Sequence, residues 1–139
     1  MSTTTQPIEI VGVAHLGIRV ADLERSLRFY EQLGFRLIAG PFEHEPVAIL
    51  ENAAGVEINL IVNASPMSGG NVLMDIPEKH AGYTHVALLV PSLEQTCARL
   101  EALGIEPSGG PVTFPNGARA VFVRDPDRNV IELHERAPA

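Results

Sequence analysis

The sequence predicts an α+β chain built from two copies of one βαβββ module, and two observations carry this prediction. The first is an internal repeat: residues 13–35 align without a gap with residues 83–105, so that His15 falls on His85. The second is a change of period inside each copy. Apolar residues first alternate, as in a strand, and then recur every three or four residues, as in a helix.

The first half of each module is predicted as strand, turn and helix. Apolar residues alternate along 13–20, and Asp22 is then placed to cap the N-terminus of a helix. Gly34 follows the helical stripe, where a left-handed glycine commonly ends a helix. In the second copy Ser92 takes the capping position and Gly104 closes the helix.

The second half of each module is predicted as strands joined by turns. Residues 47–61 align with 120–134, and each segment is interrupted by a run of turn-forming residues, Asn-Ala-Ala-Gly or Asp-Pro-Asp-Arg. The whole chain, 1–139, is therefore predicted as one domain, with a first module at about 8–62, a connector at 63–82 and a second module at about 83–136.

Composition narrows the function classes. The formal net charge of −7 disfavours nucleic acid and anionic membranes as partners. The chain has no apolar run of the roughly 18 residues that a membrane span needs, and its first residues lack the pattern of a signal peptide. Cys97 is the single cysteine, so no intrachain disulfide can form. We therefore expect a cytoplasmic protein that acts on a small molecule.

Four polar side chains are predicted on strand faces turned away from the helices: His15, Asn59, His85 and Glu132. If a pseudo-twofold axis relates the modules, these side chains converge on it. Two imidazoles and one carboxylate form the ligand set that suits ferrous iron, and zinc, nickel, manganese or cobalt would accept the same donors. We predict one divalent metal ion held by His15, His85 and Glu132.

Three further residues are candidates for catalysis. His134 shares the strand face of Glu132, Tyr83 shares that of His85, and Glu57 shares that of Asn59. Each could serve as an acid or a base at the same centre.

These segments resemble the vicinal-oxygen-chelate superfamily, which includes glyoxalase I, extradiol dioxygenases and bleomycin-resistance proteins. The resemblance rests on AHLGIRVADLERSLRFYEQLGF, YTHVALLV and FVRDPDRNVIELHE. It implies that the two modules curl into an eight-stranded cup with the helices outside. It also implies a homodimer, the metal ligands His15, His85 and Glu132, and a substrate that offers the metal two neighbouring oxygens.

Asn59 departs from glyoxalase I, which carries a Glu there as a fourth ligand. The three-ligand set favours an extradiol-type dioxygenase with Fe²⁺, in which His134 or Tyr83 would move protons. The alternative is a glyoxalase-like lyase or isomerase, in which Glu57 or a released Glu132 would be the base. A metal-free antibiotic-binding protein, similar to the bleomycin-resistance proteins, is a second alternative. Asn59 would contact substrate or form a weak fourth metal contact.

Overall fold

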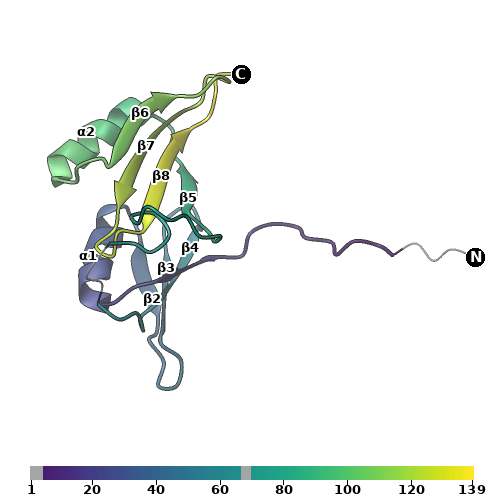
Figure 1. Cartoon of the computed structure of the whole chain (residues 1–139), viewed down its shortest axis with the longest axis vertical. Coiled ribbons are helices and arrows are strands. Elements are labelled where there is room, and N and C mark those ends of the chain that lie inside the picture. Colours follow the sequence, from purple (N-terminus) through teal and green to yellow (C-terminus); the bar gives the residue numbers. More distant parts are fainter. Residues whose placement is uncertain (1–4, 67–69) are drawn as a thin grey trace, which may run out of the picture.

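The computed structural model describes residues 5–66 and 70–139. Each module contributes one helix and four strands, in the predicted order (Figure 1). The elements are β1 (Leu16–Arg19), α1 (Leu23–Gln32), β2 (Arg36–Ala39), β3 (Val47–Glu51), β4 (Glu57–Ile61), β5 (His85–Leu89), α2 (Leu93–Leu103), β6 (Gly109–Thr113), β7 (Arg119–Arg124) and β8 (Val130–Glu135).

The helix boundaries follow from the predicted capping residues. The Asp22 carboxylate accepts a hydrogen bond from the backbone N–H of Arg25 at 3.0 Å, and the Ser92 hydroxyl accepts one from Gln95 at 3.2 Å. Both contacts satisfy a first-turn N–H group that has no partner within the helix. At the other end of α2, Gly104 adopts a left-handed φ of 73°, as predicted.

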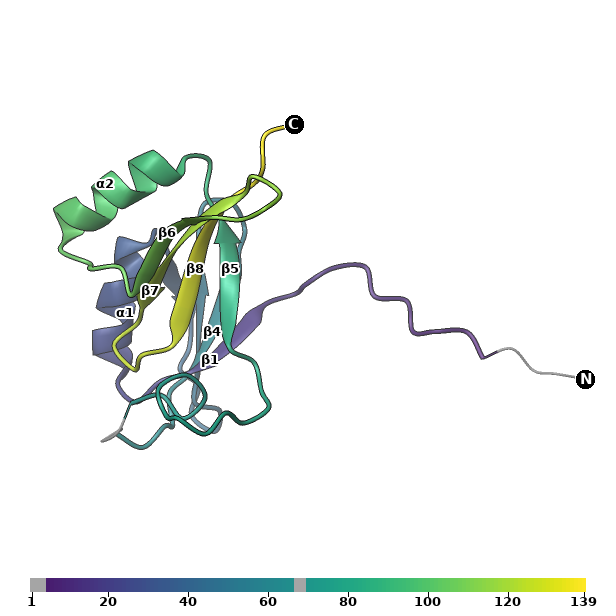
Figure 2. The ribbon, with the colours of Figure 1, turned by 45° about the horizontal axis from the view of Figure 1, so that its top comes forward.

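The strands form two sheets of four, in the orders β1-β4-β3-β2 and β5-β8-β7-β6. The first strand of each module pairs in parallel with the last one, and the remaining pairs are antiparallel. Both helices cover the same side of the curled sheets, so the other side is open (Figure 2). The α+β prediction of eight strands with helices outside is confirmed; β1 and β5 are edge strands of separate sheets.

Burial follows the predicted alternation of strand faces in β1, β3, β4 and β5, whereas the first four residues of β8 are all buried. In β4 the side chains of Ile58 and Leu60 are fully buried, and Asn59 between them lies on the open face. Apolar residues from both modules form one hydrophobic core beneath the helices. Burial of this apolar area is the main term that holds the modules together.

Polar contacts at the turn between β7 and β8 join the second module to the first. The hydroxyl of Tyr30 in α1 donates to the buried carboxylate of Asp125 at 2.8 Å. Asp127 accepts from Arg25 at 2.9 Å and from the backbone N–H of Ala21 at 3.3 Å. The helix of one module is therefore fixed to a turn of the other.

The described part of the connector is fixed to the same turn by Asp75. Its carboxylate accepts from Arg128 Nε at 2.7 Å and from Arg124 Nη1 at 3.1 Å. The hydrogen bond from Arg128, together with that from Arg124, holds the pKa of Asp75 well below its usual range. Among residues 5–66 and 70–139, no helix has the length and apolar character needed to cross a membrane.

Candidate metal centre

Three of the predicted site residues meet on the open face of the second sheet. The carboxylate of Glu132, in the middle of β8, is only 7% exposed. Its Oε1 lies 3.1 Å from Nε2 of His85, at the start of β5. Its Oε2 lies 2.6 Å from Nδ1 of His134. A buried carboxylate needs such partners, because the loss of its hydration is otherwise uncompensated.

The orientation of His85 is set by its own neighbours. Thr84 Oγ1 lies 2.8 Å from Nδ1 of the imidazole, and the ring meets Phe122 edge-on with centroids 6.0 Å apart. Because Nδ1 is engaged with the threonine hydroxyl, Nε2 is the nitrogen turned toward Glu132. The sequence analysis did not single out Thr84, whose alternation alone would place its side chain on the other face.

The first sheet carries the other predicted residues. His15, just before β1, is half-exposed, and its Nδ1 lies 3.4 Å from Oε2 of Glu57 at the start of β4. Asn59, two residues along β4, has a buried Oδ1 for which no hydrogen-bond partner is found among the described residues. The first module therefore offers one imidazole, one carboxylate and one free amide oxygen.

A single chain does not gather the complete predicted ligand set. Within residues 5–66 and 70–139, no three His, Cys, Asp or Glu side chains lie close enough together to hold one metal ion. His15 contacts Glu57, whereas His85 contacts Glu132. The predicted ligands are therefore divided into two partial sets, one on each sheet.

A shallow cavity of about 400 Å³ opens beside the second set. Glu132 and His134 line one side of it, and the segment after β6 lines the other. The ring of Phe114 stacks on His134 with centroids 5.9 Å apart and planes 19° apart. Phe114 belongs to no recognisable motif, so the sequence analysis had no signal for this contact. Tyr83, in contrast, is 98% exposed and lies outside the cluster.

The donor atoms fit a divalent metal ion. Nε2 of His85 and Oε1 of Glu132 already converge, and both are donors that zinc, nickel and ferrous iron accept. The unpartnered Oδ1 of Asn59 is a buried acceptor, and a cation would satisfy it. His134 would then hold the second carboxylate oxygen, as outer-shell groups do at metal sites.

Known proteins are similar to this chain over nearly its whole length. Lactoylglutathione lyase of Haemophilus influenzae is 32% identical over 132 residues, which cover 88% of this chain and 91% of the lyase. A glyoxalase/dioxygenase from Nostoc punctiforme superposes with a TM-score of 0.75 at 22% identity, covering 100% of this chain and 99% of that one. TnmS3, an antibiotic binding protein from Streptomyces sp. CB03234, superposes with a TM-score of 0.68 at 26% identity, covering 94% of this chain and 100% of its own.

The family model for the "Glyoxalase/Bleomycin resistance protein/Dioxygenase superfamily" matches residues 12–133, a span that runs from before β1 into β8 and includes His15, His85 and Glu132. The predicted resemblance is confirmed, and the chain belongs to this superfamily.

Proposed function

We propose that this protein is a divalent-metal-dependent enzyme that acts on a small molecule offering two neighbouring oxygens. The observation that carries the proposal is the buried Glu132 carboxylate, which lies between the imidazoles of His85 and His134. The two imidazoles offset part of the cost of burying this carboxylate, and a bound cation would offset more of it. A metal ion, once bound, would stabilise negative charge that develops on the substrate oxygens.

We further propose that the complete centre is shared between two copies of the chain. His15 and Asn59 of one copy would meet His85 and Glu132 of the other, because one chain keeps the two sets apart. A twofold homodimer forms two such centres from two partial sets of each kind. Family membership supports this assembly, since proteins of this superfamily often dimerise.

For the reaction we favour a glyoxalase-like isomerisation, whereas the sequence analysis favoured a dioxygenase. The relative from Haemophilus influenzae is named lactoylglutathione lyase, and nothing in the comparisons prefers a dioxygenase. In such a reaction a proton leaves one carbon and returns to the neighbouring carbon, so no oxidant is consumed. Asn59 cannot accept that proton. Glu132 can, and its Oε2 lies 2.6 Å from Nδ1 of His134, which can relay it.

Two other functions have an observation in their favour. The two imidazoles and one carboxylate, with the neutral Asn59 in the fourth position, also suit an Fe²⁺-dependent extradiol-type dioxygenase. The likeness to TnmS3 supports a metal-free antibiotic-binding protein. The first would need dioxygen, and the second would bind its ligand without metal.

Metal content and activity separate these functions. Protein purified without chelators should hold one divalent ion per site, and His85→Ala or Glu132→Ala should lose it. His44→Ala, at an imidazole that is 91% exposed, is the matched control and should keep it. His134→Phe should keep the metal but lower kcat about 100-fold or more. Full metal occupancy in Glu132→Ala would contradict the ligand assignment.

Turnover then identifies the class of reaction. Nickel- or zinc-loaded protein should isomerise the adduct of methylglyoxal and glutathione. Oxygen uptake with catechols by the iron-loaded protein alone would instead favour the dioxygenase. Tight antibiotic binding to chelator-treated protein, with no turnover, would favour the binding protein.

A mixing experiment tests the shared centre. His15→Ala and Glu132→Ala should each be inactive alone, yet a mixed dimer of the two retains one intact centre. Random exchange of subunits should therefore restore about a quarter of the wild-type activity. No recovery after demonstrated subunit exchange would place all the ligands of each centre in one chain.

A further inference from the structure

We propose that residues 5–14, the N-terminal arm, dock along the free edge of β5 in a second copy of the chain. This proposal rests on the shared centre proposed above and extends its interface well beyond the metal ligands. It assigns a role to two features that the centre does not use, which are the arm itself and a groove between the modules.

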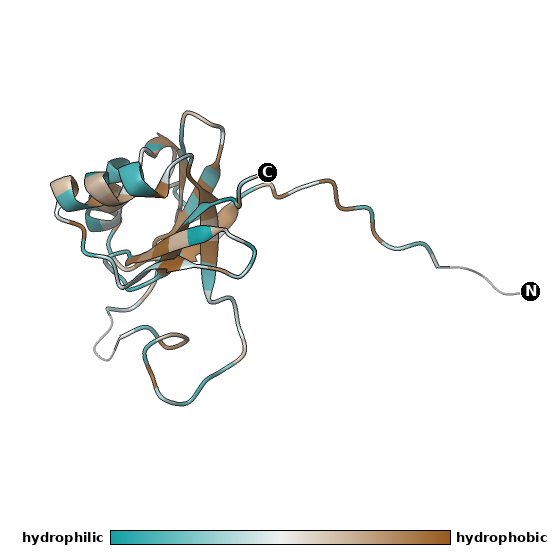
Figure 3. Cartoon of the chain, turned by 90° about the horizontal axis from the view of Figure 1, so that it is seen from above, coloured by the Kyte–Doolittle hydropathy of each residue, from teal (hydrophilic) through white to brown (hydrophobic). Residues whose placement is uncertain are grey.

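The arm is extended, apolar and unsupported in the single chain. It projects away from the body of the protein (Figure 1), and apolar positions recur along it (Figure 3). Four of its side chains, Ile8, Ile10, Val11 and Val13, are 82–92% exposed. Ile8 and Ile10 lie on one face of an extended chain, and Val11 and Val13 on the other. A strand with apolar side chains on both faces is typical of one that is covered on both sides.

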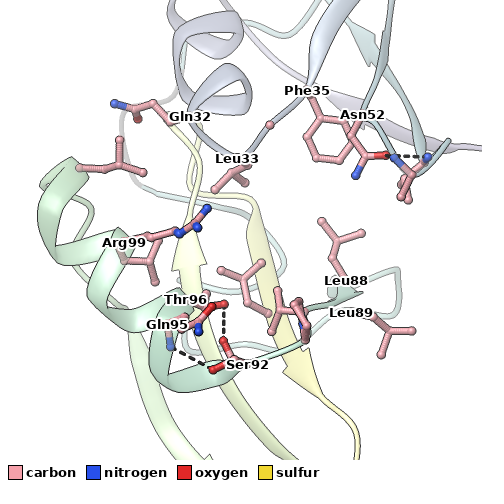
Figure 4. A pocket seen from close by; sticks show the side chains of 18 of the residues that line it. Gln32, Leu33, Phe35, Asn52, Leu88, Leu89, Ser92, Gln95, Thr96 and Arg99 are labelled. Carbon is pink, nitrogen blue, oxygen red and sulfur yellow. Dashed lines mark hydrogen bonds between the residues drawn. The ribbon is translucent and has the colours of Figure 1, made fainter.

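The receiving groove is a cavity of about 720 Å³ along the junction of the two modules. The end of α1 and the turn between β3 and β4 form one wall, and the end of β5 with the start of α2 forms the other (Figure 4). Its apolar lining includes Leu33, Phe35, Leu88, Leu89 and Leu103. Because β5 is an edge strand of its sheet, its outer backbone groups are available to an added strand.

His15 and His85 hold equivalent positions in the two modules. If both bind one ion, the arm that precedes His15 lies next to this groove. Both imidazoles meet at one ion if a pseudo-twofold axis relates the first module of one copy to the second module of the other. With that axis perpendicular to the strands, the strands that carry the two imidazoles lie side by side in opposite directions. The chain before His15 then runs beside β5 of the second copy, past His85 toward its end. In this register Val11 lies opposite Leu89 on the open face. Ile8 and Ile10 lie on the helix side, as Leu88 does, and enter the groove.

The one charged side chain of the arm does not enter the groove. Alternation places Glu9 on the face of Val11 and Val13, while Ile8 and Ile10 are the side chains turned to the groove. Only apolar side chains of the arm therefore meet the apolar lining. A second copy is thus the occupant, because the shared centre brings an apolar arm to an apolar groove.

Cross-linking between copies tests the docking. Cys97 is the only cysteine, so Cys97→Ser gives a cysteine-free background. In that background, full-length Val11→Cys is mixed with tagged, full-length Leu89→Cys and oxidised. Directly opposed residues of paired strands approach closely enough for a disulfide. Val112→Cys, an exposed position on the edge strand β6, replaces Leu89→Cys in the control. We expect the first mixed disulfide to form at least about 10-fold faster than the control.

Solution assembly gives a second measurement. Ile8→Asp combined with Ile10→Asp should raise the Kd of the dimer at least about 100-fold in sedimentation experiments. Thr5→Asp combined with Gln6→Asp adds the same charge to the arm and should leave the Kd unchanged. Equal cross-linking to positions 89 and 112, a monomeric wild-type protein, or an unchanged Kd in the isoleucine variant would each overturn the docking. Metal content, measured on the same samples, reports separately on the proposed function.

Discussion

Tyr30→Phe should destabilise the protein far more than the loss of one oxygen atom suggests. Tyr30 is fully buried, and its hydroxyl donates to the carboxylate of Asp125, which is 2% exposed. Asp125 also accepts from the backbone N–H groups of Asp127 and Asn129 and from the side-chain amide of Asn129. The substitution removes one of four donors and leaves a buried oxygen facing a phenylalanine ring.

The expected size follows from the charge of the acceptor. A hydrogen bond to an ionised group contributes roughly 1.5–3 kcal/mol, so we expect a loss of about 2 kcal/mol at pH 7. For a chain of this length that corresponds to a fall in Tm of about 6 °C. The lost hydrogen bond joins α1 of the first module to the turn between β7 and β8 of the second. The substitution therefore weakens the contact between the two modules.

The loss should depend on pH in a definite direction. Burial raises the pKa of Asp125, and the hydrogen bonds from Asn129 and Tyr30 oppose that rise. In Tyr30→Phe the pKa of Asp125 in the folded protein is therefore higher than in the wild type. The Asp125 carboxyl therefore binds a proton more readily in the folded variant than in the folded wild type. The variant's loss of unfolding free energy is complete at pH values above the pKa of Asp125 in the folded variant. The deficit shrinks as the pH falls through that value.

Urea unfolding followed by far-ultraviolet circular dichroism at pH 7 and at pH 4–5 measures both effects. Tyr83→Phe is the matched control, because Tyr83 is the other tyrosine of the chain and is 98% exposed. Its free energy of unfolding should change by less than about 0.5 kcal/mol. A change below that limit in Tyr30→Phe, or a deficit that grows toward acidic pH, would refute the reasoning.

Two further predictions concern the contacts around the same turn. Asp75→Asn should lower stability at pH 7 by about 1 kcal/mol, after allowance for solvent screening of the pairs with Arg128 and Arg124. Because the pKa of Asp75 is depressed on folding, thermal melts of variant and wild type should converge as the pH falls below about 3.8. Asp127→Ala should lower the Tm by several degrees, since the contacts to Arg25 and to a backbone N–H are lost; an unchanged Tm would show that this contact is not needed.

The modules could be predicted from the sequence because each of their predicted elements occurs in both copies of the internal repeat. Strand alternation and helical spacing are local properties, and a repeat confirms each element by its copy. The capping residues Asp22 and Ser92 and the left-handed Gly104 could be named for the same reason, since each acts on its own neighbours in the chain. The open faces that carry His15, Asn59, His85 and Glu132 followed from alternation alone.

The tertiary structure decided which of these faces meet, because contacts between distant residues depend on how whole sheets pack. Alternation placed His134 on the face of Glu132 but could not show that their atoms lie 2.6 Å apart. It could not show that His15 contacts Glu57 and stays apart from His85. The bond from Tyr30 to Asp125 joins residues in different modules. Neither partner carries a local signal for the other, since burial and register set their approach only after both modules have folded.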